Sequence, residues 1–97
     1  MRVNGSDEDP RVAELHTAVA RLRRELAAHP AEFTDRGIAE DELAALAEMA
    51  YGGAPEIPRM RRSLLLVAGA IGSVSALAAG LAAVRVAVEM FGEPGRG

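Results

Sequence analysis

Two histidines are the first residues in this chain whose chemistry could serve catalysis or metal binding. His16 and His29 lie 13 residues apart. Neither has a second histidine or an acid at the spacing of the zinc-binding helix motif. The simpler interpretation places both on the solvent side of a helix. The chain contains no cysteine, which excludes thiolate catalysis and thiolate metal sites.

Carboxylates and hydroxyls offer no stronger site. Glu40, Asp41 and Glu42 are consecutive, and consecutive residues of a helix point in different directions. A first helical turn matched to the helix dipole therefore explains them better than a metal or acid–base cluster. Ser73 and Ser75 lack a nearby general base. We predict no catalytic residue, no metal and no cofactor.

Arginine supplies every basic side chain, since the eleven basic residues include no lysine. Arg59, Arg61 and Arg62 directly precede an apolar run, where they could contact lipid headgroups or an acidic partner such as the acidic turn at Glu40–Glu42. A second group is interpreted as a solvated helix face: Arg21, Arg23 and Arg24.

Charge is distributed unevenly along the chain. Residues 1–58 hold 12 acids and 6 arginines, a balance of −6, whereas residues 59–97 hold 2 acids and 5 arginines, a balance of +3. A nucleic-acid binder would need a basic face, and with one Tyr, two Phe and no Trp there is no aromatic platform for bases. We therefore expect no nucleic-acid partner.

Two amphipathic helices are expected in the first half. Asp9 as N-cap and Pro10 at the first helical position mark the first start, and Pro30 requires an end by His29. Its apolar stripe recurs at helical spacing: Val12, Leu15, Val19, Leu22 and Leu26. A second helix, capped by Thr34 or Asp35, runs to Gly52-Gly53 with its own apolar side: Ile38, Leu43, Leu46, Ala47 and Ala50.

The last segment begins near Pro58, ends at Phe91 and contains 21 uncharged residues, Leu64–Val84. One uninterrupted helix over this segment would be about 50 Å long. Alternatively, Gly72 ends one helix and Ser73 or Ser75 caps another. A stripe of small residues would let a second helix approach closely and is a candidate interface: Gly69, Gly72, Ala76, Ala79 and Ala83.

The same 21 residues could span a bilayer, with the preceding arginines holding the N-terminus in the cytoplasm. Only nine of the 21 are Leu, Ile or Val, so they supply about −3 to −5 kcal/mol of insertion energy at most. A membrane span would also leave the two amphipathic helices without a partner for their stripes. We therefore favour a helical bundle.

The chain resembles a family of small uncharacterised actinobacterial proteins, a domain of unknown function. Three stretches carry the resemblance: Glu8–Leu15, Ile38–Leu43, and Arg61–Leu66 with Gly69–Leu77. The resemblance covers almost the whole chain and implies no activity or site. More weakly, the alanine-rich last segment resembles the closing helices of small adaptor domains of bacterial conflict systems.

These observations predict an all-α bundle of three helices, or four if the last segment breaks near Gly72, in which two amphipathic helices pack a long apolar C-terminal helix. The single domain spans residues 9–92, with disordered ends at 1–8 and 93–97. We expect a non-catalytic cytoplasmic interaction or oligomerisation module that forms a homo-oligomer. The alternative is a single-span protein of the inner or plasma membrane with a cytoplasmic acidic helical head.

Overall fold

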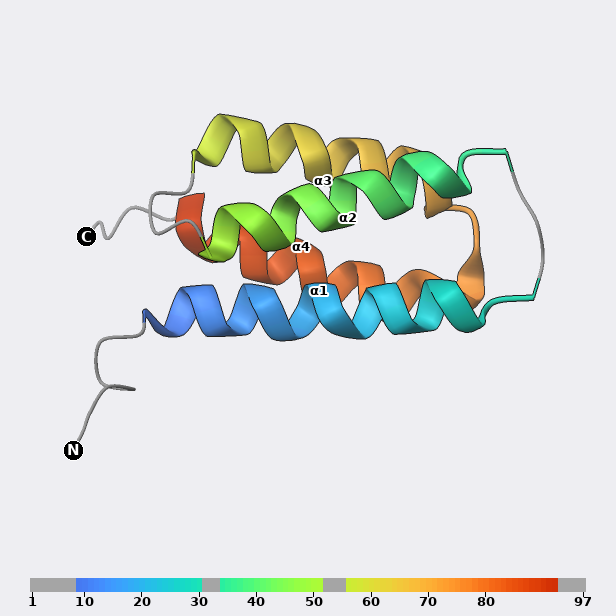
Figure 1. Ribbon diagram of the computed structural model, residues 1–97, viewed down its shortest axis with the longest axis horizontal. Helices are drawn as coiled ribbons and strands as arrows, with labels where there is room; N and C mark the ends of the chain where they lie inside the picture. Colours follow the sequence, from blue (N-terminus) through green and yellow to red (C-terminus); the bar gives the residue numbers. More distant parts are fainter. Residues whose placement is uncertain (1–8, 31–33, 52–55, 93–97) are drawn as a thin grey trace.

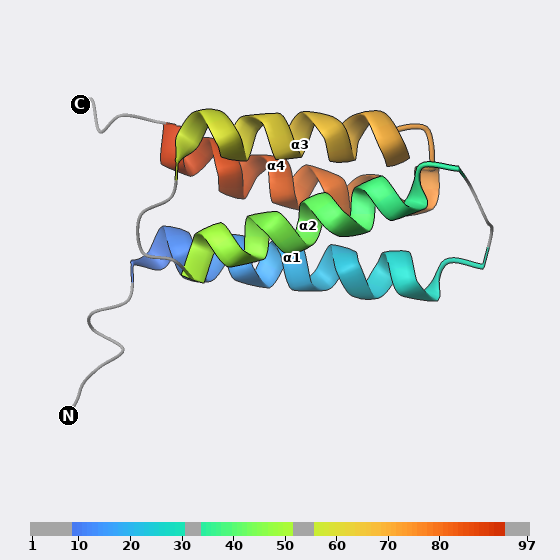
Figure 2. The ribbon, with the colours of Figure 1, turned by 45° about the horizontal axis from the view of Figure 1, so that its top comes forward.

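Four helices run side by side along the long axis of the molecule, each opposite in direction to the one before (Figures 1 and 2). A computed structural model describes residues 9–30, 34–51 and 56–92. The helices are α1 (Pro10–Ala28), α2 (Arg36–Tyr51), α3 (Ile57–Ile71) and α4 (Ala78–Gly92), with a short 3-10 turn, η2, at Ser75–Leu77. The all-α bundle is confirmed in its four-helix form. The predicted disordered ends, 1–8 and 93–97, lie outside the described residues.

The first helix begins where the sequence predicts. The Asp9 side chain accepts a hydrogen bond from the backbone N–H of Arg11 at 2.9 Å, and Pro10 takes the first helical position. The Arg11 guanidinium also bonds the carboxylate, and these bonds hold the pKa of Asp9 below its ordinary value. The cap therefore stabilises the helix at neutral pH, and this contribution is lost as acid protonates Asp9.

An arginine connects the end of α1 to the start of α2. The Arg36 guanidinium donates to the backbone carbonyls of His29, at 3.1 Å, and Leu26. These carbonyls belong to the C-terminal end of α1, where a cation complements the helix dipole. The Arg36 side chain therefore ties the start of α2 to the backbone at the end of α1.

The predicted long C-terminal helix is wrong, because the chain turns at residues 72–74. Gly72 is the C-cap of α3, and its N–H donates to the Ala68 carbonyl at 2.8 Å. Val74 adopts an extended backbone and precedes η2. The break is where the alternative placed it, but Val74 occupies the capping position, which was predicted for Ser73 or Ser75, and no side-chain cap forms there.

All four helices contribute to one core. Each turns a row of apolar side chains inward, and the buried residues with essentially no exposed surface include Leu15, Leu22, Leu26, Leu43, Leu46, Met60, Val67 and Val84. Helix α2 packs mainly against α3 and α1, and α4 packs mainly against α1. The stripes predicted for the first two helices are therefore buried against the two halves of the last segment.

Gly80 of α4 lies tightly against side chains of α1. A Cβ added there would meet the Glu25 carboxylate and lie 3.0 Å from Leu22 Cδ1. The predicted small-residue stripe lies elsewhere: Gly69, Gly72, Ala76 and Ala79 are exposed and Ala83 is half-buried. A Cβ at Gly69 would meet nothing within 4 Å. Within the described part of the chain, the glycine that allows α1 and α4 to pack closely is therefore Gly80, which is not a member of the predicted stripe.

We expect Gly80→Leu to lower the free energy of unfolding by about 1–3 kcal/mol, because the larger side chain overpacks the contact with Leu22. Gly69→Leu is the matched control, since it makes the same change in an open part of α3. Urea denaturation of dilute protein measures both. Equal stability of the two variants would contradict the close approach of α1 and α4.

A membrane-spanning helix would need more length and apolarity than the helices observed. Across residues 9–30, 34–51 and 56–92, no helix satisfies both requirements. The reason is the turn at residues 72–74, which divides the 21 uncharged residues between α3 and α4. The single span predicted as the alternative is therefore not supported.

Candidate functional site

Helix α3 presents two very different sides. Its inner side carries Met60, Ser63, Val67 and Ile71, all buried. Its outer side carries three arginines, two leucines and two glycines, all exposed: Arg59, Arg61, Arg62, Leu65, Leu66, Gly69 and Gly72. The inner side holds the helix in the bundle, so the outer side is available for contact with another molecule.

Two large apolar side chains lie in water on this outer side. Leu65 is 71% exposed and Leu66 is 42% exposed. Single exposed apolar residues are ordinary on protein surfaces. Here the two exposed leucines are adjacent, on a helix whose core side is already filled.

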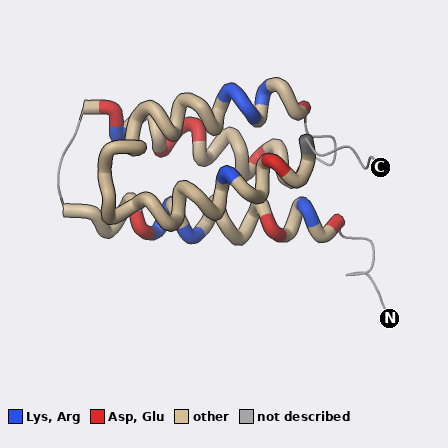
Figure 3. The backbone as a smooth tube through the Cα atoms, turned by 180° about the vertical axis from the view of Figure 1, so that it is seen from behind, with Lys and Arg blue, Asp and Glu red and all other residues tan. Residues whose placement is uncertain are grey.

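The three arginines of α3 carry no ion pair within the described part of the chain. Because α2 and α3 are antiparallel (Figure 1), the start of α3 lies beside the end of α2. Figure 3 shows the arginines of α3 toward the end of the bundle where α1 begins and α4 ends. Among the described residues, no ion pair joins Arg59, Arg61 or Arg62 to the predicted acidic turn at Glu40–Glu42, although Arg59, Arg62 and Glu42 line the same groove.

A groove between α2 and α3 borders this surface, with a volume of about 870 Å³. Its lining residues are Glu42, Ala45, Glu56, Pro58, Arg59, Arg62, Ser63 and Leu66. The Ser63 hydroxyl donates a hydrogen bond to Glu42 Oε1 at 2.8 Å. Sequence reasoning missed this pair, although Ser63 stands three residues after Met60 and four before Val67, on the buried side of the helix.

We expect Ser63→Ala to lower stability by about 0.5–1.5 kcal/mol through loss of this hydrogen bond. Glu42→Gln is the matched variant, because its amide oxygen still accepts the bond without the charge. Thermal melts of both variants make the comparison. A Ser63→Ala variant as stable as the parent would show that the bond contributes nothing net to folding.

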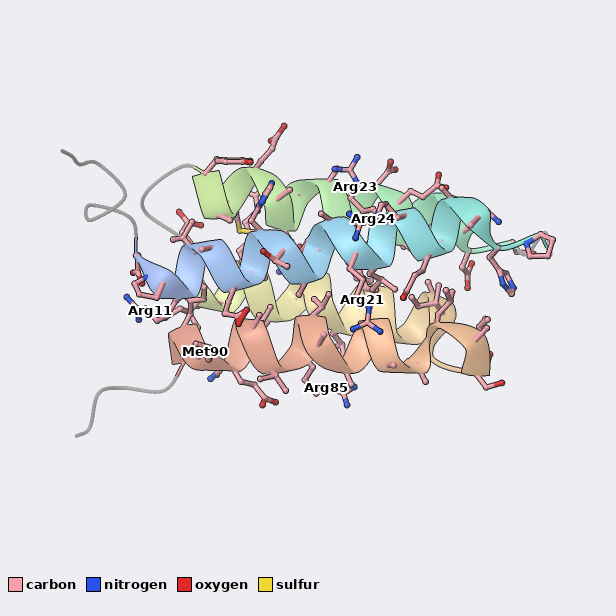
Figure 4. All side chains as sticks on the ribbon, turned by 90° about the horizontal axis from the view of Figure 1, so that it is seen from below. Arg11, Arg21, Arg23, Arg24, Arg85 and Met90 are labelled. Carbon is pink, nitrogen blue, oxygen red and sulfur yellow. The ribbon has the colours of Figure 1, made fainter. Side chains whose placement is uncertain are left out.

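A second, smaller groove lies between α1 and α4 on another face. It has a volume of about 400 Å³ and is lined by Glu14, Thr17, Ala18, Arg21, Ala83, Val86, Ala87 and Met90. Figure 4 shows Arg21 and Met90 along the two helices. Arg21 is bonded to Glu25 at 3.0 Å, so the cation bordering this groove already has a partner in the chain.

The histidine and acidic side chains considered for catalysis or metal binding do not assemble a site in the described residues. His16 Nε2 and the Tyr51 hydroxyl share a hydrogen bond at 2.5 Å, and the rings meet edge to face. This contact joins α1 to the end of α2. Within residues 9–30, 34–51 and 56–92, no three His, Cys, Asp or Glu side chains gather as a metal site would require.

Comparison with known protein families identifies the family to which the chain belongs. The sequence profile of a family of unknown function, DUF5955, matches residues 4–92. The chain belongs to this family. No curated protein and no solved structure matches it. The predicted membership of a small uncharacterised family is thus confirmed, whereas the actinobacterial origin and the likeness to conflict-system adaptors stay predictions.

Proposed function

We propose that this DUF5955 chain is a non-catalytic helical module that acts through protein–protein contact and forms a homo-oligomer. The observation that carries the proposal is the exposed leucine pair of α3, Leu65 and Leu66, on a helix whose inner side is fully packed. Covering these side chains would remove apolar surface from water, which favours association. The cytoplasmic location stays a prediction of the sequence.

The proposed assembly is weak. Fully burying a leucine contributes about 1.5–3 kcal/mol, and Leu65 and Leu66 are already partly covered. Association costs about 4–15 kcal/mol in lost freedom of motion. At the lower end of this cost, burying both leucines in two copies leaves only a few kcal/mol of net binding energy, so we expect a dissociation constant in the millimolar range.

Sedimentation equilibrium tests this proposal on the unmodified chain. Across a series from about 10 μM to about 1 mM, we expect the weight-average mass to rise from the 10.2 kDa of one chain toward twice that value. A constant mass of one chain up to the highest concentration would contradict self-association.

We also propose that the chain binds no metal and no cofactor. Elemental analysis that finds stoichiometric zinc or iron in the purified protein would contradict this.

A further inference from the structure

The exposed residues of α3 follow the spacing of a helix–helix seam. Pro58, Arg62, Leu65, Gly69 and Gly72 are separated by four, three, four and three residues, which is the alternation found where two helices pack lengthwise. All five are exposed. We call them the outer stripe of α3.

We propose that the outer stripe packs antiparallel against the same stripe of a second copy, about a twofold axis at Leu65. This inference rests on the proposed function and names its partner and contact surface. Reversing the stripe places Arg62 opposite Gly69 of the second copy and Pro58 opposite its Gly72. Each larger side chain then meets a glycine, and the Leu65 side chains meet each other at the centre.

The positive charges of α3 favour the antiparallel over the parallel arrangement of the two helices. A parallel pair would bring the three arginines of one copy against those of the other, and like charges in contact destabilise an interface. The antiparallel pair separates the two clusters. It also lays Arg59 and Arg62 toward the C-terminal end of the partner helix, whose dipole attracts cations.

Charge also distinguishes this surface from the groove between α1 and α4. There Arg21 is already paired with Glu25, whereas within the described residues Arg59, Arg61 and Arg62 have no ion pair. The groove is flanked by Val86, which is 58% exposed. An interface there would leave both leucines and all three arginines of α3 in water.

Cysteine cross-linking tests the pairing, because the chain has no cysteine of its own. One variant carries Arg62→Cys and another carries Gly69→Cys. In the antiparallel pair a cysteine at 62 lies opposite one at 69, while two cysteines at 62 lie about 10 Å apart along the axis. A disulfide requires Cα atoms within about 7 Å.

We expect mild oxidation of the mixed variants to yield at least tenfold more disulfide dimer than either variant alone, with mass spectrometry identifying the 62–69 bond. Cross-linking of each variant with itself, with no 62–69 bond found in the mixture, would establish a parallel pair and overturn the inference.

Val86→Cys places a cysteine on the exposed side of α4 and serves as control. Efficient cross-linking of this control, with sedimentation still showing a dimer, would overturn the α3 contact and leave the proposed function intact. Absence of cross-links in every variant, with a monomeric mass at about 1 mM, would overturn both.

Discussion

Leu22→Ala is expected to lower the free energy of unfolding by about 2–5 kcal/mol. Leu22 is completely buried, and its Cδ1 lies against α4 beside Gly80. Removing it loses apolar burial and leaves a cavity between α1 and α4. Domains of this size have about 5–15 kcal/mol of stability, so the variant loses a large fraction. Urea denaturation with linear extrapolation measures the change.

Leu65→Ala is the matched control, because it makes the same substitution at a leucine that is 71% exposed. In dilute solution we expect it to change stability by about 0.5 kcal/mol or less. If Leu65→Ala were as destabilising as Leu22→Ala, Leu65 would belong to the core and the outer stripe would not be a surface.

Leu65→Glu should raise the dissociation constant of the dimer at least a hundredfold. The substitution removes an apolar side chain from each copy, about 3 kcal/mol or more in total, and each 1.4 kcal/mol is tenfold in affinity. It also places two carboxylates against each other at the twofold axis, where they repel. Light scattering of concentrated samples measures the loss, and circular dichroism checks that the helices remain.

Val86→Glu is the control for charge, because Val86 is 58% exposed on α4 and lies outside the outer stripe. We expect this variant to associate like the parent. If the dimer dissociated in the Val86→Glu variant and persisted in the Leu65→Glu variant, the contact would lie on the α1–α4 face.

The local signals of the first two helices were sufficient to predict them from sequence. Asp9 and Pro10 fix the start of α1 in a few residues, and Pro30 requires its end. The same holds for the four buried residues of α2, which follow one helical stripe: Ala39, Leu43, Leu46 and Ala50. Three of these four were predicted, and Ile38, also predicted, is 45% exposed. Capping and periodicity depend on neighbouring residues, so they are visible without the fold.

The last segment was harder to predict because one short turn changes which side of a helix is buried. A continuous helix would place Ala78 on the inner side with Met60 and Val67. The turn at residues 72–74 shifts the phase, so Ala78 is exposed while Leu77 and Val84 are buried. In a segment this rich in alanine and glycine, periodicity alone does not show such a shift.

The candidate site was predicted in part. The arginines and glycines of α3 were identified from type and spacing, but the exposure of Leu65 and Leu66 was not. An apolar run gives no sign of which leucines lack a partner, since that depends on how α2 and α4 pack around α3. The Ser63–Glu42 bond was missed for the same reason, because it joins residues 21 apart on two helices.

A dilution series followed by amide NMR tests the central claim most directly, because it reports both association and its location. Between about 1 mM and about 10 μM protein, we expect amide shifts to change along the outer stripe, most strongly around Arg62, Leu65 and Gly69. The amides of α1 should stay constant. Spectra that do not change with concentration, or changes centred on Val86 and Met90 of α4, would contradict the claim that α3 is the contact surface.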